Sequence, residues 1–345
     1  MEAFTRAIDA GLAPGGQLSI WKHGKSLVEL AHGQTSLDVT YDLASLTKIL
    51  ATTYLFARAL HYGLCALEDP VSRYVPQAPP EPTLRQLLEH AGGFPSHLPL
   101  YERIASGLPP QEACDAIIRM AAREPLACAP DTKIIYSDLG FILLGATLER
   151  LFAEPLSALI TRGQHGVFYR DARAGALPFP ELTYAPTAHL PLSDGSLPLS
   201  VPTGVVHDPN CRAMGGVAGH AGLFGTATAV SKLMQRWLAA SRGEDDAWLK
   251  PDLVRTMWTD SRVPGRARGF DKPSPQGSHT GDVWPADTVG HLGFTGTSAW
   301  LSPSTGLSVV LVTNRSCTLP ELKAHRRSIY ADAFRAYASP RRSAI

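Results

Sequence analysis

Hydrophobic and polar positions divide the chain into strand-rich ends and a largely helical middle. Near the N-terminus, residues 17–22 and 26–31 are extended runs joined by a glycine-containing turn, which predicts a β-hairpin. Near the C-terminus, residues 295–301 and 307–313 form a similar pair around a Pro-Ser-Thr-Gly turn. We therefore expect one antiparallel sheet built from both ends of the chain.

The strongest helix signal covers residues 45–62. This stretch is apolar on most faces, which predicts a buried central helix that ends at Gly63. Two long stretches, 164–215 and 260–290, are rich in turn-forming residues and weakly periodic, so we interpret them as irregular insertions that border a site. Weaker amphipathic patterns predict further helices over residues 2–11, 84–90, 111–122, 138–152, 227–240 and 320–337.

These elements predict an α+β fold, with one antiparallel sheet and a helical region inserted between its two halves. Residues 1–62 and 215–345 would carry the sheet. Residues 63–214 would form an inserted, mostly helical and loop-rich part. We expect residues 1–345 to fold as a single unit.

Composition narrows the partners of the chain. The 345 residues are 44% hydrophobic, enough for a large core, and 32 Lys+Arg against 31 Asp+Glu leave a net charge of +1. Without a run of like charge, neither a nucleic-acid footprint nor an electrostatic membrane anchor is indicated. The expected partner is a small molecule or a short peptide, and the sequence carries no signal of oligomeric state.

Cysteine spacing and the N-terminus address compartment and metal binding. The five cysteines show no Cys-x-x-Cys spacing, so we predict free thiols, with neither a disulfide framework nor a metal site, and no cofactor. The N-terminus shows no secretory h-region, and no stretch approaches the ~20 apolar residues of a membrane span. The chain as given is therefore expected to be cytoplasmic, without a membrane span.

Two Ser-x-x-Lys motifs could pair a nucleophilic serine with a lysine. Ser19 and Lys22 lie in a predicted strand, where positions i and i+3 face opposite sides, so they cannot form the pair. Ser45 and Lys48 open the predicted buried helix, where the same spacing shares one face. The helix N-terminus would also favour a developing anion on the serine. A simpler reading makes Ser45 an ordinary helix N-cap.

Tyr136 and Asp138 lie just before and at the start of another predicted helix. From such a junction Tyr136 can project its phenol into a cleft, although a half-buried aromatic residue would show the same pattern. Asp138 is also a good N-cap for that helix.

Small residues surround His291-Leu292-Gly293-Phe294. They would let a strand edge approach a ligand closely, and a backbone N–H there could complete an oxyanion hole with the N–H of Ser45. A glycine-rich turn before a strand would look the same.

Three further polar residues outside these segments could belong to the site or order the loops around it. We interpret His220, which stands between glycine-containing neighbours, as a structural histidine bonded to a loop carbonyl, with a substrate contact in the cleft as the alternative. His207 and Asp208 could suggest a His–Asp pair, but the side chains of adjacent residues rarely face each other. We therefore interpret them as residues that order a loop.

The chain resembles the penicillin-recognising serine hydrolases, which include class C β-lactamases, D-alanyl-D-alanine peptidases and related esterases. Their three motifs are matched in order and rough separation by Ser45-x-x-Lys48, Tyr136-x-Asp138 and His291-x-Gly293. The resemblance runs from about residue 15 to 335, with supporting stretches at 83–97, 129–145 and 215–227. Residues 206–210 are similar to a subgroup of peptidoglycan-processing or recycling serine hydrolases.

The resemblance implies a β-lactamase/transpeptidase-like fold, a three-layer α/β/α sandwich in which helices flank the antiparallel sheet. It also implies roles for individual residues. Ser45 would be acylated, and Lys48 and Tyr136 would share the general acid/base work in an order that the sequence leaves open. The main-chain N–H of Phe294 would be the second oxyanion donor. The substrate-binding residues implied or weighed are Asp138, His220, His291, Gly293 and Phe294.

Asp138 departs from the family pattern, in which asparagine is usual. An ionised aspartate only accepts hydrogen bonds, and its charge would raise the pKa of Lys48. Asp138 therefore either turns away as a helix cap or meets a cationic or donor group of the substrate. This departure favours another amide or ester over penicillin as the substrate.

The predicted function is a serine hydrolase that forms an acyl-enzyme with a small amide or ester, with a cell-wall-derived peptide as the expected substrate. A carboxylesterase, a β-lactamase and a non-catalytic penicillin-binding sensor are the alternatives. A Ser-His-Asp hydrolase is disfavoured because the chain has no Gly-x-Ser-x-Gly elbow, and a metalloenzyme because it has no His-Glu-x-x-His motif.

Overall fold

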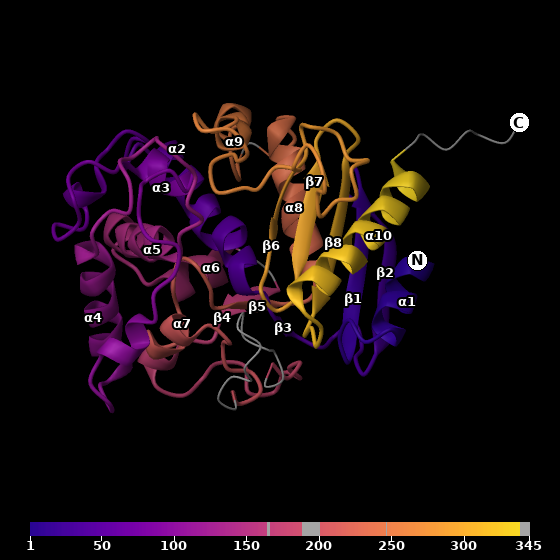
Figure 1. The fold of residues 1–345 in the computed structure, drawn as a ribbon, viewed down its shortest axis with the longest axis horizontal. Coiled ribbons are helices and arrows are strands. Elements are labelled where there is room, and N and C mark those ends of the chain that lie inside the picture. Colours follow the sequence, from indigo (N-terminus) through magenta and orange to yellow (C-terminus); the bar gives the residue numbers. More distant parts are fainter. Residues whose placement is uncertain (164–165, 188–200, 246, 339–345) are drawn as a thin grey trace, which may run out of the picture.

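A computed structural model describes the whole chain except residues 164–165, 188–200, 246 and 339–345 (Figure 1). Five strands form an antiparallel sheet in the order β2-β1-β8-β7-β6, and every strand comes from one of the two chain ends. This confirms the predicted sheet. The strands are β1 Gly15–Lys22, β2 Lys25–Gly33, β6 Val289–Leu292, β7 Ser298–Ser302 and β8 Leu307–Thr313.

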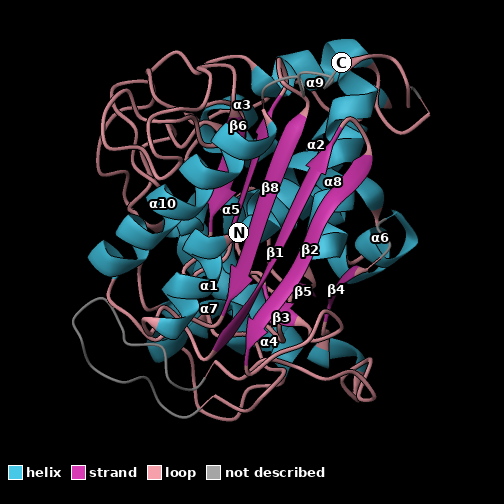
Figure 2. Ribbon diagram, turned by 90° about the vertical axis from the view of Figure 1, so that its right-hand side faces the viewer, coloured by secondary structure: helices cyan, strands magenta, loops and turns pink. Residues whose placement is uncertain are grey.

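Helices cover both faces of this sheet. α1 (Glu2–Asp9) and α10 (Leu319–Tyr337) pack together on one face, while α8 (Ala227–Ser241) packs on the other (Figure 2). Each face has its own cluster of buried apolar residues, because β8 is buried along its whole length and alternates its side chains between the two. The result is the predicted three-layer arrangement.

The remaining helices gather mainly beside the sheet, on the side opposite the N-terminus (Figure 1). A second, three-stranded sheet joins β3 (Tyr41–Asp42), β5 (Leu223–Gly225) and β4 (Val167–Tyr169). The helices are α2 Tyr54–His61, α3 Leu84–Leu88, α4 Pro110–Arg123, α5 Asp138–Phe152, α6 Leu156–Gly163, α7 Pro209–Ala213 and α9 Pro251–Trp258. Short 3-10 turns cover Val71–Arg73, Leu100–Arg103 and Ala172–Ala174.

The prediction of one continuous α-helix over residues 45–62 is wrong for the first half of that stretch. The chain forms a 3-10 turn (Ala44–Leu46, η1), then a π-helix (Lys48–Thr53, η2), and becomes α-helical only at α2. Thr52 donates its hydroxyl to the carbonyl of Gly219 (2.6 Å), and Thr47 accepts from the N–H of Leu223 (3.1 Å). Contacts with a distant segment therefore accompany the π-helix, and local propensity gives no sign of it.

Helices α3, α8 and α5 each begin at a residue whose side chain caps them. Thr83 forms a capping box with Gln86, and Thr226 caps α8 by accepting from Ala229. The N-cap of α5 is Ser137, whose hydroxyl accepts from the N–H of Gly140. The interpretation of Asp138 as that cap is wrong, which leaves its carboxylate free for another partner.

The strand predicted over 295–301 is displaced, because a tight turn separates two strands here. Gly293 donates its N–H to the carbonyl of Thr297 (2.7 Å), so β7 begins only at residue 298. β6 precedes the turn, and the sequence pattern did not predict it. This strand has four residues, and a Cβ on its Gly290 would lie 2.5 Å from ring atoms of Trp300.

The inserted part also contains regular structure. β4 and α7 lie inside the stretch 164–215 that was expected to be irregular, and residues 188–200 of that stretch fall outside the described residues. The division of the chain into two parts stays a prediction. One part is the sheet-containing residues 1–62 and 215–345, and the other is the mostly helical residues 63–214. No helix within the described residues combines the length and apolar character needed to cross a membrane.

Two glycines in α5 differ in how tightly they pack. A Cβ on Gly145 would lie 2.8 Å from the backbone nitrogen of Gly219, whereas a Cβ on Gly140 would meet nothing closer than 3.6 Å. We expect Gly145→Ala to lower the free energy of unfolding by about 1–3 kcal/mol through overpacking. Gly140→Ala should be neutral or stabilise by up to about 1 kcal/mol, because alanine favours helix. Urea unfolding checks both variants, and equal stabilities would contradict the close contact.

Candidate active site

Ser45 follows a constrained turn after β3. Ala44 has a φ of 47°, in the left-handed region that few non-glycine residues adopt. The buried carboxylate of Asp42 accepts from the N–H of Ala44 (2.9 Å) and from the N–H of His207 (2.7 Å). Burial nevertheless raises the pKa of Asp42 to about 6. These bonds fix the backbone that presents the Ser45 hydroxyl.

The ammonium group of Lys48 lies beside Ser45, one helical turn away as its spacing predicts. It donates to the Ser45 Oγ (3.1 Å), to the Asp138 Oδ1 (2.8 Å) and to the carbonyl of His220 (3.2 Å). The side chain is fully buried. Burial alone would lower the pKa of Lys48, but the negative charge of Asp138 and the hydrogen bond to it outweigh burial and raise the pKa above its ordinary value.

Tyr136 completes the group around the serine hydroxyl. Its phenol lies close enough to Lys48 and Ser45 for both groups to act on its pKa. Lys48 Nζ lies 4.8 Å from the centre of its ring, and Arg266 Cζ lies 5.0 Å from it. Burial raises the pKa of Tyr136, although Lys48 acts against that shift. The phenol is therefore protonated at neutral pH.

Asp138 faces the site from the first turn of α5. Its Oδ1 binds Lys48, and its Oδ2 lies 3.3 Å from the Nδ1 of His97. Burial would raise the pKa of Asp138, but Lys48 and His97 hold it below its ordinary value. The carboxylate thus neither caps the helix nor turns away, and its cationic partner within the chain is Lys48.

His220 reaches the site through its backbone. Its ring is buried and bonds the Asp208 Oδ1 through Nε2 (2.9 Å), rather than the expected loop carbonyl. The ring is also outside the wall of the cavity at Ser45, so the structure does not place it as a substrate contact. Asp208 caps α7 by accepting from Cys211, in line with a role in ordering its loop.

The turn between β6 and β7 forms the opposite wall. A Cβ on Gly293 would lie 2.1 Å from the Thr297 hydroxyl and 3.1 Å from the carbonyl of Leu43, so only glycine fits there. His291 is buried, its Nδ1 bonds the carbonyl of Leu292 (2.8 Å), and burial lowers its pKa to about 4. This histidine is therefore neutral at physiological pH.

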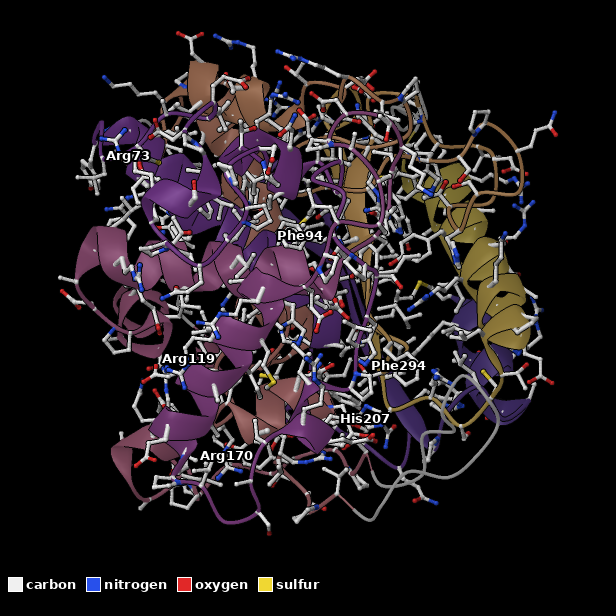
Figure 3. The ribbon with its side chains drawn as sticks, turned by 60° about the vertical axis from the view of Figure 1, so that its left-hand side comes forward. Arg73, Phe94, Arg119, Arg170, His207 and Phe294 are labelled. Atoms are coloured by element: carbon white, nitrogen blue, oxygen red, sulfur yellow. The ribbon has the colours of Figure 1, made fainter. Side chains whose placement is uncertain are left out.

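Phe294 is held by two neighbours. Its ring stacks on that of His207, with 5.4 Å between the ring centres, and both residues are labelled in Figure 3. The carbonyl of Phe294 accepts a hydrogen bond from Arg315 (2.6 Å). The Arg315 guanidinium also lies over the ring, 4.4 Å from its centre. The backbone of Phe294 is thus fixed next to the serine turn.

A cavity of about 620 Å³ opens at Ser45. One part of its wall is apolar, and another carries the cationic side chains of Arg266, Lys323 and Arg326. Arg326 donates to the carbonyls of Gly293 (3.0 Å) and Thr297, and burial lowers its pKa to about 10. The lining residues are Ser45, Tyr136, Asp138, Arg266, Asp271, His279, His291, Leu292, Gly293, Phe294, Leu319, Pro320, Leu322, Lys323 and Arg326.

The structure thus brings together all the predicted site residues except the ring of His220. It adds His97 beside Asp138, and Arg266 and His90 beside the Tyr136 ring, with His90 at 4.5 Å. No spacing rule selects these three, because each comes from a loop that only the fold brings to the site. His90 and His97 do lie in the 83–97 stretch that supports the family resemblance.

One group of side chains has the ligand atoms that a metal site would need. Among the described residues, ligand atoms of His97, Asp138 and Asp208 lie within 4.8 Å of one another. Lys48 and His220 already bond the two carboxylates, so their charge and hydrogen-bonding needs are met within the chain. We assign no metal to this group.

The buried ion pair makes a testable contribution to stability. Lys48→Met would leave the Asp138 carboxylate buried without its cation, so we expect a loss of about 3 kcal/mol in the free energy of unfolding at pH 7. Adding Asp138→Asn should recover most of it. Because the pair depresses the pKa of Asp138, its contribution is present above about pH 4 and is lost as the pH falls further. Urea unfolding of the single and double variants measures this coupling, and a Lys48→Met variant as stable as wild type would contradict it.

Comparison with known proteins places the chain. A protein of Escherichia coli (strain K12) named "Putative D-alanyl-D-alanine carboxypeptidase" is 28% identical over 315 residues, covering 80% of this chain and 69% of that one. EstCE1, a hydrolase with promiscuous acyltransferase activity, has a TM-score of 0.72 at 20% identity, covering 96% and 97% of the two chains. An octameric penicillin-binding protein homologue from Pyrococcus abyssi gives 0.72 at 19%, covering 97% and 76%. The family model named Beta-lactamase matches residues 4–333, and the chain belongs to that family.

Proposed function

We propose that this protein is a serine hydrolase that forms an acyl-enzyme on Ser45. The observation that carries the proposal is the grouping of three side chains at one cavity. The Ser45 hydroxyl lies 3.1 Å from the Lys48 ammonium, and the Tyr136 phenol lies beside both. Ser45 and Tyr136 line the cavity, while Lys48 is fully buried behind them.

Acylation would begin with attack of the Ser45 Oγ on the substrate carbonyl carbon. The carbonyl oxygen becomes an oxyanion, and the backbone N–H groups of Ser45 and Phe294 are the proposed donors to it. Rigid placement supports this role, because Asp42 fixes the serine turn and Arg315 fixes Phe294.

The proton of Ser45 would pass to a Tyr136–Lys48 pair that has lost one proton to solvent, and from this pair to the leaving alcohol or amine. The ester of Ser45 with the acyl group remains. Water then attacks that ester and gives its proton to the same pair, and the pair returns this proton to the Ser45 Oγ as the acyl–Oγ bond breaks and the acid is released.

A cell-wall-derived peptide is the proposed substrate. Lys323 and Arg326 place two cationic groups on the cavity wall, where they could receive the carboxylate at a peptide's end. The name of the Escherichia coli relative, at 28% identity, points to the same chemistry. Because His291 is neutral, these residues of α10 supply positive charge that the β6–β7 turn does not.

A carboxylesterase is the second candidate. Leu292, Phe294, Leu319 and Leu322 line the same cavity, and Leu319 is 46% exposed at its rim. Such a wall suits an apolar acyl or alcohol group. The fold is shared with the hydrolase EstCE1.

The nucleophile can be tested with a fluorophosphonate probe and peptide mass spectrometry. We expect a single adduct on Ser45 in the wild type and none in Ser45→Ala. Ser19→Ala is the matched control, because Ser19 belongs to the second Ser-x-x-Lys motif but is buried in β1 and bonds Glu29. This variant should label like the wild type. Equal labelling of Ser45→Ala and wild type would remove Ser45 as the nucleophile.

Turnover separates an enzyme from a binding protein. With p-nitrophenyl esters and muropeptides as substrates, we expect Tyr136→Phe to lower kcat/KM by about 10²–10⁴-fold, because it removes the hydroxyl that relays the proton. Thermal unfolding of the variant checks its fold. A wild-type protein that is labelled stably on Ser45 but hydrolyses none of the substrates would indicate a sensor instead.

A further inference from the structure

The ammonium group of Lys48 has no free position. Its three N–H donors are matched by three acceptors: the Ser45 hydroxyl, the Asp138 carboxylate and the His220 carbonyl. Of these acceptors, only the Asp138 carboxylate carries a full negative charge. In this arrangement Lys48 donates to Ser45 and does not accept its proton.

Asp138 is itself supported from behind. Its second oxygen lies 3.3 Å from the Nδ1 of His97, whose side chain is 45% exposed. Asp208 is the next carboxylate, within 4.8 Å of both, and it bonds the buried ring of His220 at 2.9 Å. Hydrogen bonds from both histidines therefore stabilise the carboxylates on this side in their ionised form.

The groups on the other side of the site do not cancel this effect. Arg266 lies over the Tyr136 ring but forms an ion pair with Asp271. His90 and His291 both contact the Tyr136 ring, and burial lowers the pKa of each, to about 4 for His291. Since His90 and His291 are neutral, the Asp138 carboxylate is the full negative charge in direct contact with Lys48.

Ser45 can lose its proton only to a Lys48–Tyr136 pair that has already given one proton to solvent. The two groups touch, so they release this proton as a unit. An anion 2.8 Å from the amine makes that release harder, whichever of the two groups then receives the serine proton.

We propose that Asp138 is a positioning residue that keeps this proton on the Lys48–Tyr136 pair and thereby confines the reactivity of Ser45 in the free enzyme to alkaline pH. The proposal rests on the proposed function of Ser45. Asn at this position, usual in proteins that the chain resembles, would hold the same geometry without the charge.

The test is the pH dependence of Ser45 labelling by a fluorophosphonate, between pH 6 and 10 and corrected for hydrolysis of the probe. For the wild type we expect the second-order rate constant to rise with pH across the range. In Asp138→Asn the rise should shift by about 1–3 pH units toward lower pH. The rate at pH 7 should therefore increase about tenfold or more. Asp252→Asn is the control: this exposed carboxylate on α9 pairs with Arg255, and the pH profile of the variant should match that of the wild type.

Asp138→Ala removes the same charge with a smaller side chain, and circular dichroism reports the fold of both variants. A folded variant with an unchanged profile, or one shifted toward higher pH, would overturn the proposal. The proposal would also be overturned if the rate constant of Ser45 labelling in the wild type were already independent of pH below pH 7. This outcome can be observed without any variant. Absence of any Ser45 adduct in the wild type would instead overturn the proposed function.

Discussion

The ion pair between Lys48 and Asp138 is the interaction on which the rest of the site depends. A fully buried ammonium group is costly to desolvate, by several kcal/mol even in real proteins, unless an anion and further acceptors surround it. Here they come from α5 and from the segment that carries His220. The pair therefore joins the π-helix behind Ser45 to two distant parts of the chain, and it sets the protonation state next to the nucleophile.

Much of the fold could be predicted because its signals are local. The hairpin of β1 and β2, the buried strand β8 and the caps of α3 and α8 follow from alternation, turn residues and capping residues over a few positions. The π-helix and β6 escaped because distant residues accompany both: Gly219 and Leu223 bond the first, and Trp300 packs on the second.

The site divides in the same way. Ser45 and Lys48 could be paired from a three-residue spacing, and Tyr136 and Gly293 from family motifs in the right order. The partner of Asp138 could not be predicted, because an aspartate at a helix start reads equally well as a cap, and the neighbouring Ser137 takes that role. His97 and Arg266 contact the site from loops with no periodic pattern, so only the fold reveals them.

The protonation state of Lys48 is the most direct measure of the central claim. Protein labelled with 13Cε-lysine, with Lys48→Arg to assign the signal, can be titrated by NMR. The structure predicts that the Lys48 resonance keeps its ammonium position up to about pH 10, because Asp138 outweighs burial. A Lys48 signal that titrates near or below about pH 8 would show that burial prevails and that Asp138 does not hold the proton.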